Sequence, residues 1–259
     1  MNHNQLSPSD AALVSMHSRS AIRERLRAGP SHSYLKDFVY GAIDGAVTTF
    51  AVVSGVAGAE LSSSIVIILG IANLVGDGFS MAASNYLATK SEKEAAEQAH
   101  REEQRHIDAI PEGQREELRQ VFASKGFEGE TLERIVETIS GNRELWAETI
   151  VQEMFGLYTV DAGKPFRAGL ATLVAFLTVG VIPLMPFLFP ALAPELAFAT
   201  SAAATSVAFV AIGFFKGRAL GQPPLRASLE TLLVGGSAAL LAYGVGALLQ
   251  SWIGSGWGA

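Results

Sequence analysis

Five apolar runs, each long enough to cross a lipid bilayer as a helix, place the strongest constraint on the fold of this chain. They cover residues 38–59, 65–88, 166–190, 194–215 and 229–250. Because a membrane-spanning helix requires about 20 apolar residues, the sequence predicts an all-α membrane protein with five transmembrane helices. The third run contains Pro183, Pro186 and Pro190, so we expect its C-terminal end to be kinked or unwound.

The distribution of Lys and Arg predicts how these helices are oriented. All 19 residues lie before the first run, at or between the second and third runs, or between the fourth and fifth. Five spans bring these basic regions to one face, and an excess of positive charge marks the cytoplasmic face. We therefore expect a multi-pass protein of the cell (inner) membrane, with a cytoplasmic N-terminus and a C-terminus outside.

The apolar runs divide the chain into five segments. They are a basic N-terminal segment (1–36), transmembrane helices one and two (37–88), a charged insert (89–165), transmembrane helices three to five (166–250) and a C-terminal tail (251–259). The insert holds 17 of the 25 acidic residues, and its pattern predicts a helical cytoplasmic domain between spans two and three. The N-terminal segment fits either an interfacial helix on anionic lipid or a mobile basic tail.

A single carboxylate, Asp44, lies within the first apolar run, which contains no Lys or Arg. A carboxylate in hydrocarbon costs roughly 2.5–3.5 kcal/mol, and such residues persist where they face a cavity, a partner or a bound cation. We interpret Asp44 as part of a polar path; the alternative is that it only bonds a neighbouring helix. The same run contains Gly41 and Gly45, a spacing that permits close packing within one chain or between two.

A stripe of polar side chains follows one face of the second run and forms either the wall of a path or a seam between helices. Its members are Asn73, Asp77, Ser80, Met81 and Ser84. Asp44 lies seven residues from Asp37, just before the first run, and Met81 lies seven residues from Ala88 at the end of the second, so both are at a depth of about 10 Å. A carboxylate and a thioether at one level suit a borderline metal such as Fe²⁺, although a Met alone more often fills space in a core. We predict a metal path lined by Asp44, Asp77 and Met81.

The insert carries a second group of candidate metal ligands. Its members are Glu102, Glu103, His106, Glu117, Glu153 and Met154. Glu103 and Glu102 precede His106 by three and four residues, so they share a helix face with it. Carboxylates and imidazoles at these spacings can share a metal, and we predict a cytoplasmic metal-binding domain. The alternative is that these acidic helices are solvated surfaces.

Four motifs in this chain are distinctive in both their residues and their spacing. They are DGAVTTFAVVSG (44–55), GDGFSMAASNYLATKSE (76–92), RHIDAIP (105–111) and LWAETIVQEMFGL (145–157). With them the chain resembles the vacuolar iron transporter family, as a divergent, bacterial-type member. The resemblance implies a dimeric, proton-coupled exporter of Fe²⁺, and often Mn²⁺, whose path is lined by an Asp and a Met that correspond to Asp44 and Met81. A eukaryotic member would lie in a vacuolar-type membrane.

The insert departs from the pattern of that family, whose members usually carry two Glu-x-x-Glu pairs. In this chain the first pair is Glu103 and His106, and the second pair is Gln114 and Glu117, so His106 and Gln114 stand where the family usually has Glu. A neutral His106 still binds metal, whereas the Gln114 amide is a poor ligand for a transition metal. The resemblance therefore implies weaker or altered metal binding in the insert.

These patterns favour a secondary transporter that exchanges a divalent metal for protons. The main alternative is a non-transporting, membrane-bound metal sensor or scaffold, which needs no ligands deep in the membrane. A ferritin-like iron oxidase needs Glu-x-x-His motifs from several helices that face inward, and apart from Glu103 and His106 no such motif here has matching partners. The chain has no Cys for thiolate sites and no GxxxxGK[ST] nucleotide motif. We expect no enzymatic activity, no cofactor and no nucleic-acid partner; the expected partners are metal ions, protons, the lipid bilayer and a second copy in a homodimer.

Overall fold

The structure is a computed structural model that describes residues 8–28, 34–158 and 162–256, and all regular elements in these ranges are helices. Parts of the predicted N-terminal segment, insert and C-terminal tail therefore lie outside the described residues. The chain divides into two compact units, Met1–Lys36 and Asp37–Ala259. The second unit contains all of the predicted site residues.

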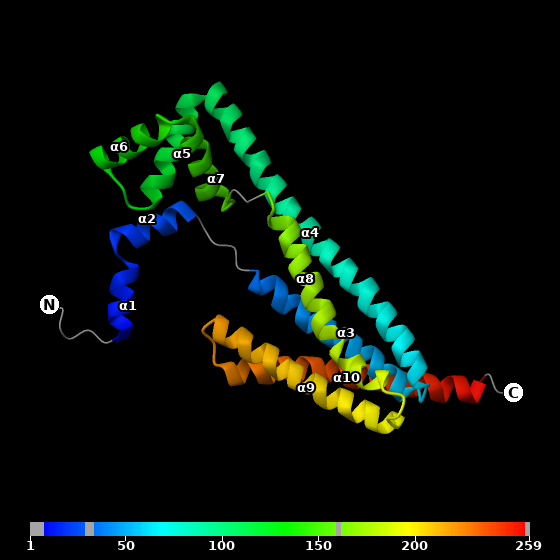
Figure 1. Ribbon diagram of the computed structural model, residues 1–259. Helices are drawn as coiled ribbons and strands as arrows, with labels where there is room; N and C mark the ends of the chain where they lie inside the picture. The colour runs from blue at the N-terminus through cyan, green and yellow to red at the C-terminus, as the bar shows by residue number, and fades with distance from the viewer. Residues whose placement is uncertain (1–7, 29–33, 159–161, 257–259) are drawn as a thin grey trace. The chain divides into compact units, whose positions relative to one another are not determined.

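The first unit contains two short helices, α1 (Pro8–Met16) and α2 (Arg19–Ala28) (Figure 1). Nη2 of Arg25 donates to the carbonyl oxygen of Met16 over 2.8 Å, which fastens α2 to the end of α1. Arg23 and Ile22 are exposed side by side on α2. Residues 8–16 and 19–28 of this segment are helical, and an interfacial position on anionic lipid stays a prediction.

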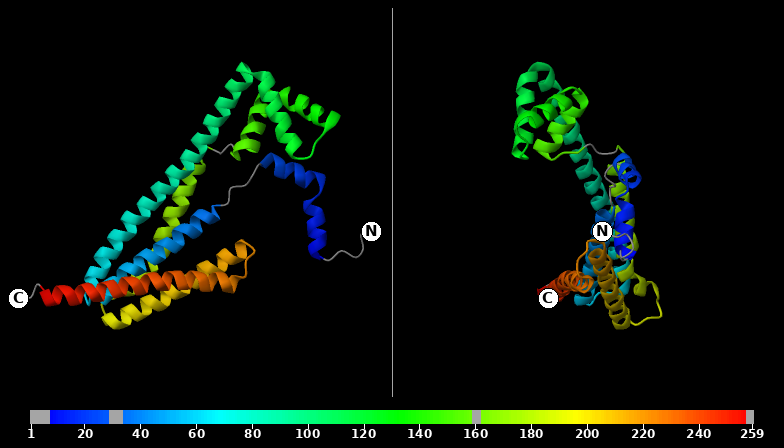
Figure 2. Two further views of the ribbon diagram at one scale, coloured as in Figure 1. Left: turned by 180° about the vertical axis from the view of Figure 1, so that it is seen from behind. Right: turned by 90° about the vertical axis from the view of Figure 1, so that its left-hand side faces the viewer.

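Four helices are each long and apolar enough to cross a membrane. They are α3 (Leu35–Gly58), α4 (Ser63–Ala109), α9 (Pro194–Ala219) and α10 (Pro224–Gly256). A fifth span results if α8 (Lys164–Gly180) and the short 3₁₀ helix η2 (Ile182–Leu188) form one bent pair. Figures 1 and 2 show α8 beside α4, and α9 beside α10. The chain is a multi-pass membrane protein whose described elements are all helical.

The bend between α8 and η2 confirms the predicted kink in the third apolar run. The two axes are bent by 41°. Pro183 lies in the first turn of η2 and Pro186 lies inside it, and neither can donate a backbone hydrogen bond. Oγ of Ser201 on α9 donates to the carbonyl oxygen of Pro183 over 2.6 Å. Because Pro183 and Ser201 are buried, the irregular backbone is satisfied inside the protein, as a membrane setting requires.

Glycines bring α3 into backbone contact with α8. A Cβ on Gly41 would lie 2.4 Å from the carbonyl oxygen of Thr172, and one on Gly45 would lie 2.5 Å from that of Phe176. Near the other end of α3, a Cβ on Gly58 would lie 2.2 Å from a backbone oxygen of α10. The Gly41 and Gly45 pair therefore packs helices within one chain, which was one of its two interpretations.

The insert folds around the second half of α4, which runs unbroken from Ser63 to Ala109. Its 47 residues span about 70 Å, more than twice the thickness of the hydrocarbon core. Three further helices complete the domain, namely α5 (Pro111–Ser124), α6 (Gly129–Ser140) and α7 (Arg143–Phe155). They share an apolar core of Ile107, Leu118, Leu132, Val136, Trp146, Ala147 and Ile150. Because α4 is continuous, it connects this core directly to the membrane helices.

Candidate functional site

Two carboxylates lie close together between α3 and α4. Asp44 and Asp77 are both half-buried, and they are near enough to repel each other electrostatically. Each is followed by a glycine that contacts Phe176 of α8: Gly45 meets its backbone, and a Cβ on Gly78 would lie 2.9 Å from its ring. Phe176 is fully buried and packs against both helices at the level of the carboxylates.

The other members of the polar stripe on α4 fall on two sides of the helix. Asn73 is half-buried, and its Nδ2 atom has no hydrogen-bond partner within the described residues. Met81, one turn beyond Asp77, is half-buried and packs against the apolar cluster of the membrane helices. Ser80 and Ser84 are exposed. The stripe therefore divides into an inward set of Asn73, Asp77 and Met81 and an outward pair of serines.

An amide joins three helices at a level closer to the insert. Nδ2 of Asn85 on α4 donates to Oδ1 of Asp37 on α3 over 2.9 Å and to Oγ1 of Thr172 on α8 over 2.7 Å. Asp37 and Thr172 are both buried. Sequence reasoning missed this contact; the available signal was the position of Asn85 four residues after Met81, on the same face of α4.

In the insert, the two predicted pairs meet in one group, which we call the Glu103 cluster: Glu103 and His106 on α4, and Gln114 and Glu117 on α5. Glu103 is buried, and its Oε1 lies 3.6 Å from Nδ1 of His106. Nε2 of Gln114 donates to Oε2 of Glu117 over 2.7 Å. Glu117, His106 and Gln114 all influence the charge of Glu103, so the turn between α4 and α5 brings the four side chains together.

Glu103 differs from the other carboxylates of the insert in its electrostatic environment. Burial, followed by the nearby Glu117 carboxylate, raises the pKa of Glu103 above its ordinary value. His106 and a hydrogen bond from Gln114 favour the charged form, but they do not cancel this effect. The Oε2 atom of Glu103 is buried without a hydrogen-bond partner in the described part of the chain. A divalent cation at this atom would favour the charged carboxylate.

The remaining predicted ligands of the insert lie apart from this cluster. Glu102 and Met154 are exposed, and Oε2 of Glu153 pairs with Nζ of Lys125 at 2.5 Å. Within residues 8–28, 34–158 and 162–256, no three His, Asp or Glu side chains are arranged closely enough to hold a metal ion. The Gln114 amide interacts with both cluster carboxylates, Glu103 and Glu117.

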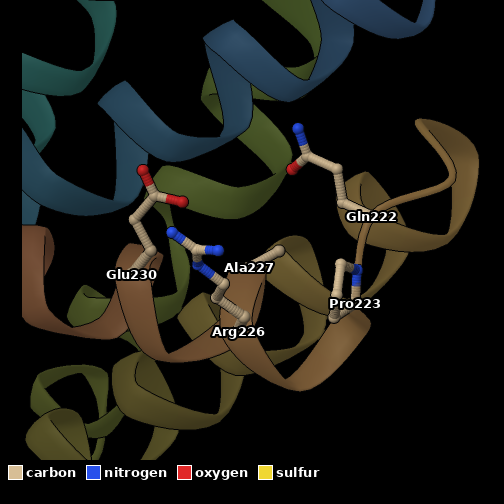
Figure 3. Close-up of a pocket in the computed structure, with 5 residues that line it drawn as sticks. All are labelled: Gln222, Pro223, Arg226, Ala227 and Glu230. Carbon is tan, nitrogen blue, oxygen red and sulfur yellow. The ribbon is translucent and has the colours of Figure 1, made fainter.

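Two cavities lie outside these groups. One has a volume of about 350 Å³ and is lined by Gln222, Pro223, Arg226, Ala227 and Glu230, where α9 turns into α10. Figure 3 shows the side chains of Arg226 and Glu230 projecting from α10 toward the same side. The other is an open, apolar groove of about 420 Å³ lined by α3, α9 and α10. No predicted metal ligand lines either cavity.

The sequence is similar to proteins of one membrane family. The family model described as the VIT family matches residues 35–247. A vacuolar iron transporter of Toxoplasma gondii is 31% identical over 233 residues, which are 87% of this chain and 77% of that protein. Vacuolar iron transporter 1 of Arabidopsis thaliana is 30% identical over 216 residues, 83% of this chain and 86% of that protein. Vacuolar iron transporter 1 of Oryza sativa subsp. japonica is 28% identical over 221 residues, which are 85% of this chain and 87% of that protein.

Proposed function

The chain belongs to the VIT family, and from this premise we propose that it exports Fe²⁺ from the cytoplasm, with Mn²⁺ as a second substrate, in exchange for protons. Its relatives are named iron transporters, so the chain is a membrane transporter of metal and not an enzyme. In this proposal the metal is the transported substrate, and no resident cofactor takes part.

The observation that carries the proposal is the placement of two half-buried carboxylates, Asp44 on α3 and Asp77 on α4, each beside a glycine that packs against Phe176 and within electrostatic range of the other. Like charges in a medium of low dielectric constant repel strongly, and burying them is unfavourable unless a cation lies near. One divalent cation balances both carboxylates, and so do two protons. Metal and protons therefore compete for the same pair, and exchange of one for the other is the simplest transport cycle that the pair supports.

Two further groups support metal as the substrate. Met81 lies one turn from Asp77 and offers a thioether, which favours Fe²⁺ over harder ions such as Mg²⁺. In the insert, Oε2 of Glu103, which has no hydrogen-bond partner among the described residues, offers a position for an incoming cation. We infer that the Glu103 cluster gathers metal in the cytoplasm and that Asp44, Asp77 and Met81 pass it across the membrane.

The proposal includes a topology of five spans, formed by α3, α4, the bent pair α8–η2, α9 and α10. The positions of Lys and Arg support a cytoplasmic N-terminus and insert, and a C-terminus on the opposite side. The bacterial cell membrane, or a vacuolar-type membrane in a eukaryote, would hold the protein in this orientation. Export from the cytoplasm then runs from the insert toward the C-terminal side.

A second copy of the chain is also part of the proposal. Ser80 and Ser84 are polar side chains exposed on the membrane-spanning part of α4, beside the exposed Phe79. Small polar residues of this kind commonly bond across helix interfaces in membranes. The chain has no Cys, so a Ser84→Cys variant gives a disulfide-linked dimer only where two copies meet. A variant that stays monomeric under oxidation would contradict an interface at this face.

Purified protein reconstituted in liposomes tests the proposed substrate. Vesicles should take up Fe²⁺ under anaerobic conditions and Mn²⁺, and they should exclude Mg²⁺ and Ca²⁺. A sensor or scaffold would bind metal and move none of these ions. Empty liposomes and liposomes that hold the Asp44→Asn variant give the background.

A further inference from the structure

The contact between Asn85, Asp37 and Thr172 has no part in the proposed path, yet it joins the helices that form it. We call these three side chains the Asn85 clamp. Besides its bonds to Asp37 Oδ1 and Thr172 Oγ1, Nδ2 of Asn85 lies 3.3 Å from the carbonyl oxygen of Ala168. Oγ1 of Thr172 donates to that same carbonyl oxygen over 3.1 Å. The clamp thus takes one side chain from each of α3, α4 and α8.

The chemistry of the clamp is directional. The two N–H groups of the Asn85 amide serve a carboxylate and a hydroxyl, and the hydroxyl of Thr172 accepts from Asn85 while it donates to Ala168. A hydrogen bond to a charged acceptor is stronger than one between neutral groups. Because Asp37 and Thr172 are buried, removal of the amide leaves polar groups that water cannot easily reach.

The clamp lies close to the carboxylate pair along all three helices. Asp37 precedes Asp44 by seven residues on α3, a distance of about 10 Å. Asn85 follows Asp77 by eight residues on α4, about 12 Å. On α8, Thr172 lies one turn from the Phe176 that contacts both glycines beside the carboxylates. The same three helices therefore meet at two neighbouring levels.

The helices are held together by different contacts at the two levels. At the carboxylate level, Gly45 of α3 packs against the backbone of Phe176 and Gly78 of α4 packs against its ring, so the two helices meet through a residue of α8. At the clamp level, Asn85 bonds α4 directly to α3 and so fixes which faces of the two helices meet. A small rotation of α4 there would move Asp77 relative to Asp44, because a continuous helix turns as one body.

We propose that Asn85 is a positioning residue for transport: its clamp sets the rotation of α4 against α3 and so the approach of Asp77 to Asp44. This inference rests on the proposed function, since it assigns Asn85 a role in the exchange cycle of that carboxylate pair. The clamp binds no metal itself. It lies between the Glu103 cluster and the carboxylate pair along α4, and its loss leaves the cluster intact.

Exchange of the bonding partners tests the clamp. In Asn85→Asp two carboxylates face each other, and we expect maximal Fe²⁺ uptake to fall about tenfold or more. Asp37→Asn should lose less, because the new amide can present its oxygen to Asn85. The double variant Asp37→Asn/Asn85→Asp restores an amide–carboxylate bond with reversed polarity, and the Thr172 hydroxyl can turn to donate. We expect the double variant to recover uptake to within about threefold of the unaltered protein.

A geometric measurement separates positioning from mere stability. Because the chain has no Cys, Asp44→Cys/Asp77→Cys carries one defined pair of thiols, and its disulfide formation under mild oxidation reports the approach of α3 to α4. Adding Asn85→Leu should slow this cross-link about tenfold while Mn²⁺ binding at the Glu103 cluster stays unchanged. Metal binding at the cluster shows that the variant is folded.

The outcomes separate this inference from the proposed function. If the unaltered protein moves no metal, the proposed function fails, and the cross-linking rates still decide whether Asn85 positions the helices. If the unaltered protein moves Fe²⁺ but Asn85→Asp keeps its maximal rate, or the double variant recovers nothing, the positioning role is overturned. Equal cross-linking rates with Asn85 and Leu at this position would overturn it as well.

Discussion

Carboxylates in the membrane helices and carboxylates in the insert differ in what balances their charge. Asp44 and Asp77 lie in apolar runs without Lys or Arg, and Asp77 is a like-charged neighbour of Asp44. In the insert, a hydrogen bond from Arg143 lowers the pKa of Asp108, and one from Arg119 lowers the pKa of Glu133. A carboxylate already paired with a guanidinium has little attraction left for a metal ion.

Glu103 is the residue of the insert that resembles the membrane pair. It is buried, a second carboxylate lies near it, and its raised pKa shows that nearby groups do not fully balance its charge. We infer that the capacity of these sites to bind a cation depends on how far cationic side chains already balance the carboxylates, and not on the number of acidic residues. The insert holds 17 acidic residues, and the Glu103 cluster uses two of them.

The largest expected effect comes from removal of one charge of the membrane pair. Asp44→Asn leaves Asp77 with a neutral neighbour, so the site can no longer balance a divalent cation. We expect Fe²⁺ uptake by liposomes to fall about 100-fold, because breaking a buried charge pair costs several kcal/mol. Mn²⁺ binding at the Glu103 cluster should be unchanged.

Glu230→Gln is the matched control for this variant, because it removes a carboxylate from α10 at a cavity that contains no predicted ligand. We expect near-normal uptake from it. If folded Asp44→Asn protein transports Fe²⁺ at the full rate, the Asp44 and Asp77 pair has no part in the mechanism. The contrast between the membrane carboxylates and those of the insert would then have no functional meaning.

The next effect concerns the insert. Glu103→Gln should weaken Mn²⁺ binding about tenfold or more, since changes close to a metal commonly cost 10–100-fold in affinity. Glu102→Gln, one residue away but exposed, should change it little. Calorimetry in the Asp44→Asn background isolates the insert from the path. Equal effects of the two substitutions would mean that burial and charge balance do not select the metal site.

A smaller effect is expected from Met81. Met81→Leu keeps the volume nearly constant and removes the sulfur, so we expect uptake of Fe²⁺ to fall about fivefold relative to Mn²⁺, with the melting temperature unchanged. Met185→Leu, at an exposed site on η2, is the control. A lower melting temperature with no change in metal preference would make Met81 a packing residue.

The smallest effect concerns the pH dependence of the insert. Imidazole rings gain a proton between about pH 8 and 5, and only the neutral ring binds metal. The raised pKa of Glu103 adds to this competition, because protons hold that carboxylate at a higher pH than an exposed one. Metal affinity should therefore fall as pH decreases from about 7.5 to 5.5.

His106→Glu should flatten this dependence and strengthen Mn²⁺ binding near pH 6 about fourfold, since a glutamate with an ordinary pKa near 4.3 stays anionic there. Calorimetric titration at three pH values, again in the Asp44→Asn background, compares the two proteins. Identical pH profiles would show that His106 is not a ligand and that Glu103 and Glu117 act alone.

Local signals in the sequence were sufficient for the helices and for the kink at Pro183. The ends of the insert helices also carry local signals, because Pro111 begins α5 and Gly126 and Gly141 follow α5 and α6. Likewise, no Gly or Pro interrupts the second half of α4, so its continuity follows from sequence.

Contacts between helices were harder to predict. Depth along each span placed Asp44 and Met81 at one level, and the path of Asp44, Asp77 and Met81 stays a prediction; in the structure Asp77 lies within electrostatic range of Asp44. Depth is a local property, but the facing side of a helix depends on its rotation, which Phe176 and the Asn85 clamp set from α8 and α3. The ion pair of Lys125 with Glu153 was missed for the same reason, as it joins residues of different helices.

The central claim is that metal and protons compete for the carboxylates of Asp44 and Asp77. Liposomes that hold a pH-sensitive dye, with the insert facing outward, test it most directly when Fe²⁺ uptake and internal pH are recorded together. The account predicts that each Fe²⁺ entering is matched by protons leaving, that an acidic interior accelerates uptake, and that Asp44→Asn abolishes both signals. Fe²⁺ uptake at full rate with no proton movement and no response to the pH gradient would contradict it.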